Sequence, residues 1–195
     1  ATDFDLFTTT SIFTDDTICT VAVAEWLQQG GRDDLAVYMR HWCHRYDSSY
    51  GNHFRAWLAS ANPQPYHSYG NGAAMRVSPV AWHWDSLAET LAYAEKSAAI
   101  THNHPEGIRG AQATAAAIFW ARQGKDKAFI KGHISAEYGY DLSASCAAIR
   151  PHYYFNETCQ ETVPQAIVAF LESRDFEEAI RLAVSLGGDS DTLAA

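Results

Sequence analysis

Residues 14–27 read TDDTICTVAVAEWL, and this stretch decides the fold class. After a polar opening the segment is apolar nearly all round, which predicts a buried helix. Thr14 or Asp15 is suited to the N-cap position, and the Gly30-Gly31 pair is suited to end the helix. The first regular element of the chain is therefore expected to be a helix inside the core.

Helical patterns continue along most of the remaining chain. They combine apolar residues at three- and four-residue spacing with recognisable starts and stops. Helices are expected at about Asp33 to Tyr46, around Phe54 to Leu58, after the capping boxes Ser86/Glu89 and Asp175/Glu178, at 105–124, 125–138 and 143–149, and from Pro164 onward. No alternating run predicts a strand, and no repeat or low-complexity linker divides the chain. The prediction is one all-α domain over residues 1–195.

Composition narrows the classes of function. The chain has 195 residues, 47% of them hydrophobic, which is enough to bury a sizeable core. Its formal net charge of −9 repels phosphate backbones, so a role in coating nucleic acids is excluded, although a specific site on one is not. No apolar run approaches the roughly 20 residues of a membrane span, and no signal peptide is recognised.

The four cysteines indicate a reduced setting. Cys19, Cys43, Cys146 and Cys159 match neither a C-x-x-C pair nor a disulfide framework, and they are read as small buried hydrophobes. The expectation is a cytoplasmic monomer.

The chain termini lead to a further expectation. No Met begins the chain, and only three residues follow the helix start at 189–192, too few for a stable helix. We expect the intact protein to extend beyond both Ala1 and Ala195, so the domain is read as truncated at both ends.

Two acidic clusters, TDDT at 14–17 and GGDSDT at 187–192, are the first candidates for chemistry. Helix capping is one explanation, because a single N-cap Asp, Ser or Thr stabilises a helix by about 1 kcal/mol. A second carboxylate beside the first adds repulsion that capping does not need. Hard divalent cations are the other explanation, since Mg²⁺ and Mn²⁺ prefer oxygen ligands, and the two clusters together could hold two adjacent ions.

Two loops are candidates for ligand binding. Residues 69–76 read YGNGAAMR, where small residues let the backbone approach a ligand, although a simple turn before a helix fits as well. Residues 101–107 read THNHPEG. Its His-x-His could bind zinc, but no Cys or third His completes such a site, so hydrogen bonding to a polar ligand at the helix start is favoured.

Taken in order, FTDDT (13–17), GNGAAMR (70–76), THNHP (101–105) and GDSDT (188–192) resemble the ADP-ribosylglycohydrolase family, which includes the dinitrogenase reductase-activating glycohydrolases. The resemblance covers nearly the whole chain. It implies a compact orthogonal helical bundle with a binuclear Mg²⁺ or Mn²⁺ centre. The metal ligands that it implies are Thr14, Asp15, Asp16, Asp189, Asp191 and Thr192.

The resemblance also implies a substrate and a reaction. Gly70, Asn71, Gly72 and Met75 would line an ADP-ribose cleft, with His102 and His104 binding the ligand. Asp15, Asp16, Asp189 and Asp191 would be the catalytic residues of a metal-dependent hydrolase. This enzyme would cleave the glycosidic bond at C1″ of the distal ribose and release ADP-ribose from a modified protein, nucleic-acid base or small molecule.

Some features of the family are absent, and other functions remain open. Family members usually have an earlier helix with a glycine-rich segment and a glutamate, and this segment is missing here. Some members also carry an acidic residue in a loop that could correspond to residues 46–51, where this chain has Asp47. The main alternative is a non-hydrolytic role, either ADP-ribose binding or neutralisation of an ADP-ribosylating toxin as an immunity protein. A structural domain with well-capped helices is a third reading.

Overall fold

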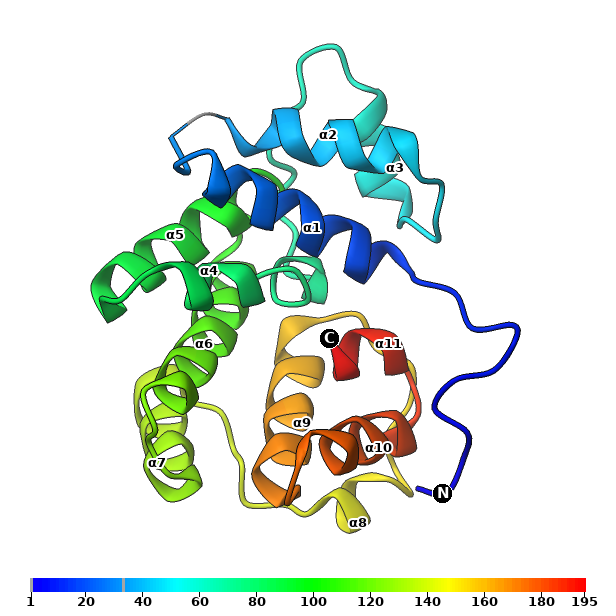
Figure 1. The fold of residues 1–195 in the computed structure, drawn as a ribbon, viewed down its shortest axis with the longest axis vertical. Coiled ribbons are helices and arrows are strands. Elements are labelled where there is room, and N and C mark those ends of the chain that lie inside the picture. The colour runs from blue at the N-terminus through cyan, green and yellow to red at the C-terminus, as the bar shows by residue number, and fades with distance from the viewer. Residues whose placement is uncertain (1, 33) are drawn as a thin grey trace.

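Helices account for all the regular structure of the described residues, which are 2–32 and 34–195 of a computed structural model (Figure 1). The predicted all-α class is confirmed. The helices are α1 (Asp15–Gln28), α2 (Leu35–Arg45), α3 (Asn52–Ala59), the 3-10 turn η1 (Asn71–Ala73), α4 (Ser78–His83), α5 (Leu87–Ala99), α6 (Pro105–Arg122), α7 (Lys127–Tyr138), α8 (Cys146–Ile149), α9 (Cys159–Glu172), α10 (Phe176–Leu186) and α11 (Ser190–Ala194). None of them is both long and apolar enough to cross a membrane.

Side-chain caps set several of the helix starts that the sequence predicted. Ser86 and Asp175 accept hydrogen bonds from the backbone N–H groups of Glu89 and Glu178, so both capping boxes begin a helix. The expected start of α2 at Asp33 lies outside the described residues, and Asp34 caps the helix. The expected helix at 143–149 is shorter than predicted, because Ser145 caps it and helical structure begins at Cys146.

The predicted helix start at Pro164 was wrong. α9 begins five residues earlier, at Cys159, and Pro164 lies inside it. A proline near the start of a helix removes only one interior hydrogen bond. Burial of Cys159, Thr162 and Val163 in the same helix offsets that loss. The sequence analysis also missed the short helix α4.

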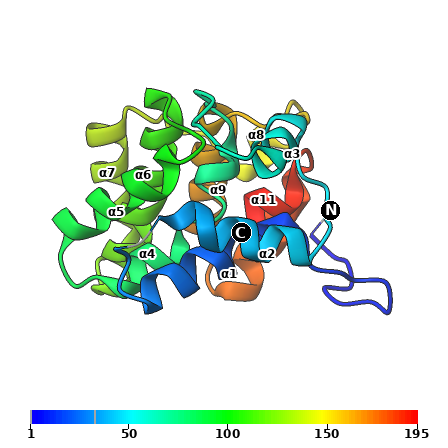
Figure 2. The ribbon, with the colours of Figure 1, turned by 90° about the horizontal axis from the view of Figure 1, so that it is seen from above.

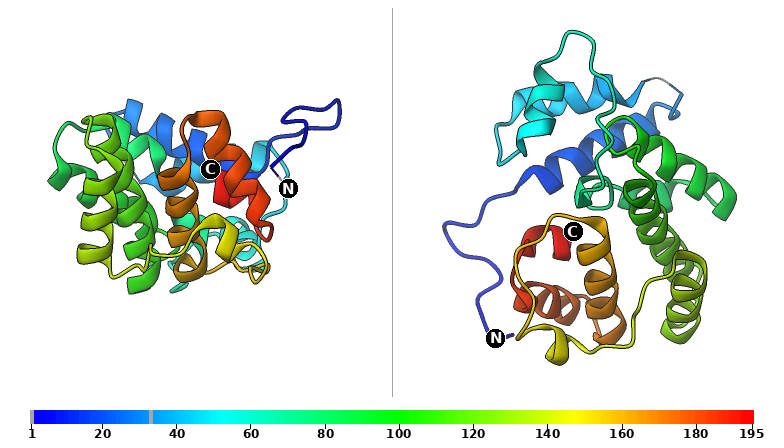
Figure 3. Two further views of the ribbon diagram at one scale, coloured as in Figure 1. Left: turned by 90° about the horizontal axis from the view of Figure 1, so that it is seen from below. Right: turned by 180° about the vertical axis from the view of Figure 1, so that it is seen from behind.

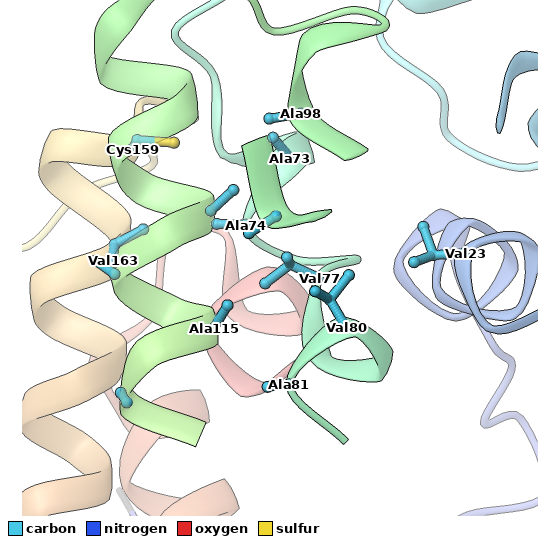
Figure 4. Close-up of a cluster of buried hydrophobic side chains, with 14 of the residues drawn as sticks. Val23, Ala73, Ala74, Val77, Val80, Ala81, Ala98, Ala115, Cys159 and Val163 are labelled. Carbon is cyan, nitrogen blue, oxygen red and sulfur yellow. The ribbon is translucent and has the colours of Figure 1, made fainter. Parts of the chain in front are cut away.

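α6 is the central element of the bundle. It packs against α4, α5, α7 and α9, while α1 packs against α2 and α4. Figure 4 shows the small side chains that fill the space between these helices, from Val23 of α1 through Val77 and Val80 to Val163 of α9. Small residues let helix backbones approach closely, so the elements that carry the sequence motifs are held in one rigid body.

The two ends of the regular structure lie close together. Figures 1 and 2 show the last helix, α11, beside the start of α1, and Figure 3 shows the same neighbourhood from below and from behind. The segment before α1 runs along the outside of the bundle, and Arg181 of α10 donates hydrogen bonds to the carbonyls of Thr2 and Phe4. The fold therefore brings the two acidic clusters to one place.

The close approach of α6 and α9 can be tested at Gly110. A Cβ atom there would lie 2.5 Å from Sγ and 2.8 Å from Cβ of Cys159. We expect Gly110→Ala to lower the free energy of unfolding, measured by urea denaturation, by about 1–3 kcal/mol through overpacking. The control is Gly132→Ala, inside α7 with no atom within 4 Å of the new Cβ, which should raise it by about 0.5–1 kcal/mol. Equal effects of the two variants would contradict this account of the packing.

Candidate active site

Four carboxylates from the two ends of the chain face one another. Asp15 and Asp16 occupy the first turn of α1, Asp189 precedes α11, and Asp191 lies in its first turn. The pKa of Asp16 is raised to about 6, mainly by burial and next by the charge of Asp191, against a hydrogen bond from Thr14 that lowers it. The pKa of Asp189 is also raised to about 6, mainly by burial and also by the charges of Asp191 and Asp16, against a hydrogen bond from Asn71 that lowers it. The predicted meeting of the clusters is therefore present in the fold.

The hydrogen bonds of these side chains point to a role other than capping. Thr14 and Asp189 occupy N-cap positions, but neither side chain caps its helix. The hydroxyl of Thr14 instead donates to Oδ2 of Asp16 at 2.9 Å, and the Asn71 amide donates to Oδ2 of Asp189 at 2.7 Å. Among residues 2–32 and 34–195, Oδ1 of Asp16 is buried without a hydrogen-bond partner, although the nearby Thr192 side chain lowers the pKa of the carboxyl. A buried carboxylate oxygen with no donor is costly, so it calls for a ligand.

The donor chemistry fits hard divalent cations. Carboxylate and threonine oxygens are the ligands that Mg²⁺ and Mn²⁺ prefer, and the unpartnered Oδ1 of Asp16 is free to bind one. Within the described ranges, no three His, Cys, Asp or Glu side chains are already grouped around one point. Such a group is not required, because Mg²⁺ keeps several waters and commonly binds through one or two carboxylates.

A cleft of about 550 Å³ opens over the carboxylates. Most of the residues singled out from the sequence line it. They are Asp15, Asp16, Gly70, Asn71, Gly72, Met75, His102, Asp189, Asp191 and Thr192. The Gly70–Gly72 loop is fixed to the segment before α9, since the backbone N–H of Asn71 donates to the carbonyl of Glu157 at 2.7 Å. The cleft thus joins the acidic clusters to the glycine loop.

Thr14 and His104 are the two predicted site residues that do not line the cleft. Thr14 reaches it only through its bond to Asp16. His104 is the N-cap of α6, where its Nδ1 accepts a hydrogen bond from the backbone N–H of Glu106. Its ring packs against His67 and Tyr69. Of the two histidines in the THNHP motif, the cleft contains only His102.

Several cleft residues were missed by the sequence analysis. Apart from Cys19 inside α1 and Arg76 at the end of the GNGAAMR motif, they come from loops and helix starts without a recognisable pattern; the full set is Cys19, Ser49, Gly51, Asn52, His53, Phe54, Tyr66, Ser68, Arg76, Phe155 and Glu157. Arg76 carried a signal, because it ends the GNGAAMR motif, but it received no role. Asp47 is exposed, pairs with Arg55 and does not line the cleft, whereas its neighbour Ser48 donates to Asp15 at 3.4 Å.

The model of the ADP-ribosylglycohydrolase family matches residues 2–195. The chain belongs to this family. A solved structure titled ADP-ribosylglycohydrolase-related protein complex aligns with a TM-score of 0.74 at 27% identity, over 94% of this chain and 68% of the other. The resemblance drawn from the four motifs is confirmed.

Two curated relatives match a smaller share. An uncharacterized protein of Archaeoglobus fulgidus is 33% identical over 64% of this chain and 46% of its own length. The human ADP-ribosylhydrolase ARH3 is 27% identical over 65% of this chain and 47% of its own length. The matched region is therefore about half the length of these relatives.

The crowding of carboxylates predicts how stability depends on pH without metal. Because the folded-state pKa values of Asp16 and Asp189 are raised, the folded protein binds these protons more tightly than the unfolded chain. Their contribution to stability is full below about pH 4 and is lost as pH rises through about 6. In EDTA at about pH 7.5, Asp16→Asn should therefore raise the free energy of unfolding by about 1–3 kcal/mol.

The asparagine oxygen can still accept the Thr14 bond, which keeps this comparison clean. The gain should disappear in urea titrations at about pH 4, where wild-type Asp16 is already protonated. The control Asp5→Asn changes an exposed residue of the N-terminal segment and should show no pH-dependent gain. A destabilised Asp16→Asn at neutral pH would contradict the predicted repulsion.

Proposed function

We propose that this protein hydrolyses the glycosidic bond between ADP-ribose and a modified target and releases ADP-ribose. The observation that carries the proposal is the convergence of the acidic clusters beneath a cleft that also contains the Gly70–Gly72 loop. Membership of the ADP-ribosylglycohydrolase family supports the same reaction. The target would be an ADP-ribosylated protein, nucleic-acid base or small molecule.

Different residues of the cleft would contribute to different parts of the reaction. Cleavage of a glycosidic bond builds positive charge on the sugar ring, and nearby carboxylates lower the energy of that charge. Asp16 places a buried carboxylate in this region of the cleft. Asn71 fixes the position of the Asp189 carboxylate. The missing side chains at Gly70 and Gly72 let the His102 ring pack against the loop backbone beside the cleft.

We further propose two divalent ions, Mg²⁺ or Mn²⁺, held by Thr14, Asp15, Asp16, Asp189, Asp191 and Thr192. Bound ions would supply Lewis acidity and lower the pKa of a bound water. The protein supplies the oxygen ligands, and the unpartnered Oδ1 of Asp16 supports the assignment. Bound ions would also offset the burial and the carboxylate repulsion that raise the pKa values of Asp16 and Asp189.

Release of free ADP-ribose from a panel of substrates with different linkages tests the proposed reaction. The wild-type chain should release ADP-ribose from at least one of them. Asp16→Asn and Asp189→Asn should each reduce the rate by about 100-fold or more, because each removes a charge that faces the reacting sugar. Asp5→Asn should leave it unchanged. Tight binding of ADP-ribose with no turnover of any substrate would favour a non-hydrolytic binding role instead.

Metal binding is tested separately by calorimetry. Titration of the metal-free chain with Mg²⁺ or Mn²⁺ should give heat that fits two ions per chain, with affinity that falls as pH drops below about 6, where Asp16 and Asp189 hold protons. Asp16→Asn and Asp189→Asn should each weaken binding by about tenfold or more, the effect of losing one charged ligand. Binding as strong in these variants as in Asp5→Asn would rule out the proposed ligand set.

A further inference from the structure

A buried chain of polar groups links Arg76 to the histidine of the cleft. Arg76 is 1% exposed, and its Nη2 donates to the carbonyl of Ser97 at 2.7 Å and to Oγ1 of Thr101 at 2.9 Å. Oγ1 of Thr101 lies 2.7 Å from Nδ1 of His102. No ion pair of Arg76 with a carboxylate occurs among the described residues, so the guanidinium is held by neutral acceptors.

The direction of each hydrogen bond follows from the chemistry of the donors. A guanidinium only donates, so Thr101 must accept from Arg76. The Thr101 hydroxyl has one hydrogen, and Nδ1 of His102 is the acceptor beside it. If Nδ1 carried the hydrogen instead, the Thr101 hydrogen would lack an acceptor at a fully buried position, at the cost of a lost hydrogen bond. Thr101 therefore donates, and Nδ1 accepts.

The charge state of His102 agrees with this direction. Burial holds the pKa of His102 well below its usual range, and the positive charge of Arg76 lowers it further. The imidazole is thus neutral near pH 7, a pH at which an unperturbed histidine, with a pKa of roughly 6.5, is partly protonated. A neutral ring that accepts at Nδ1 carries its only N–H at Nε2.

The Nε2 edge of the ring faces the glycine loop. A Cβ atom at Gly72 would lie 3.1 Å from Nε2, and one at Gly70 would lie 3.6 Å away. His102 lines the cleft, and no hydrogen bond from Nε2 is found within residues 2–32 and 34–195. The ring therefore occupies the space that a Cβ at Gly72 would take, and within the described residues its Nε2 has no protein acceptor where His102 lines the cleft.

We propose that Thr101, oriented by Arg76, is a positioning residue that fixes His102 as a neutral hydrogen-bond donor to an acceptor oxygen of the bound ligand. With ADP-ribose as that ligand, which rests on the proposed function, a phosphate or ribose oxygen would accept the bond. His102 does not act as a general base, because the lone pair at Nδ1 is engaged and Nε2 carries the hydrogen. The chain of hydrogen bonds from Arg76 through Thr101 to His102 thus favours ligand atoms that accept a hydrogen bond over ligand atoms that donate one at this position.

The tautomer is read directly from the ring nitrogens by NMR of the ¹⁵N-histidine-labelled chain at neutral pH, with His102→Gln used to assign the signal. Wild type should show protonated Nε2 and unprotonated Nδ1. Thr101→Val should populate both tautomers, whereas Thr101→Ser, which keeps the hydroxyl, should resemble wild type. Thr90→Val is the matched control, because it removes a buried hydroxyl of α5 that has no partner, and it should not change the His102 signal. An Nδ1–H tautomer or an imidazolium in wild type would overturn the proposal.

Titration with ADP-ribose gives the second readout on the same variants. Thr101→Val should weaken binding by about two- to fivefold, in proportion to the fraction of rings that lose the Nε2 hydrogen, while Thr101→Ser and Thr90→Val should match wild type. Unchanged affinity in Thr101→Val would overturn the positioning role. If no variant and no wild-type sample binds ADP-ribose, the proposed function fails, and the ring-nitrogen spectra of the free protein still decide the orientation of His102.

Discussion

Repulsion among the carboxylates of Asp15, Asp16, Asp189 and Asp191 is the constraint that the rest of the structure must satisfy. Burial of these groups adds to the cost, and donors from Thr14 and Asn71 offset only part of it, since the pKa values of Asp16 and Asp189 remain raised to about 6. Packing must supply the remainder. α1 is held through α2 and α4, and α11 through α9 and α10, so the two clusters cannot separate without opening the core.

This constraint explains which parts of the molecule could be predicted from the sequence. The two acidic clusters and the glycine loop are short local patterns, and their residue types alone indicate which chemistry they favour. Capping boxes such as Ser86/Glu89 are local too, and both were placed correctly. Pro164 misled the prediction, because a strong local signal was overridden by burial of the preceding turn against α6. Cleft residues such as His53 and Phe155 lie in segments without a pattern, and only the tertiary fold brings them together.

The five-residue THNHP motif shows the same limit on prediction from the sequence. Its two histidines are equivalent on paper, yet His104 caps α6 while His102 faces the cleft. The difference arises because His104 occupies the N-cap directly before Pro105, where its ring bonds the helix backbone. His102 lies two residues earlier, where the Thr101 hydroxyl, which accepts a hydrogen bond from Arg76, bonds Nδ1 of its ring. No spacing rule separates these roles, because they depend on the buried position of Arg76.

The two charge environments of the cleft have opposite signs, and this polarity constrains how a ligand lies in it. Carboxylates crowd one region, whereas the buried cation of Arg76 and the Nε2 edge of His102 lie beside the glycine loop. A diphosphate group is repelled by the carboxylates and attracted to the cation and N–H donors. Ribose hydroxyls, which are neutral, tolerate the acidic region and would suit the ions proposed there. For a ligand such as ADP-ribose, electrostatics alone therefore favours placing the distal ribose over the acidic clusters and the phosphates toward His102.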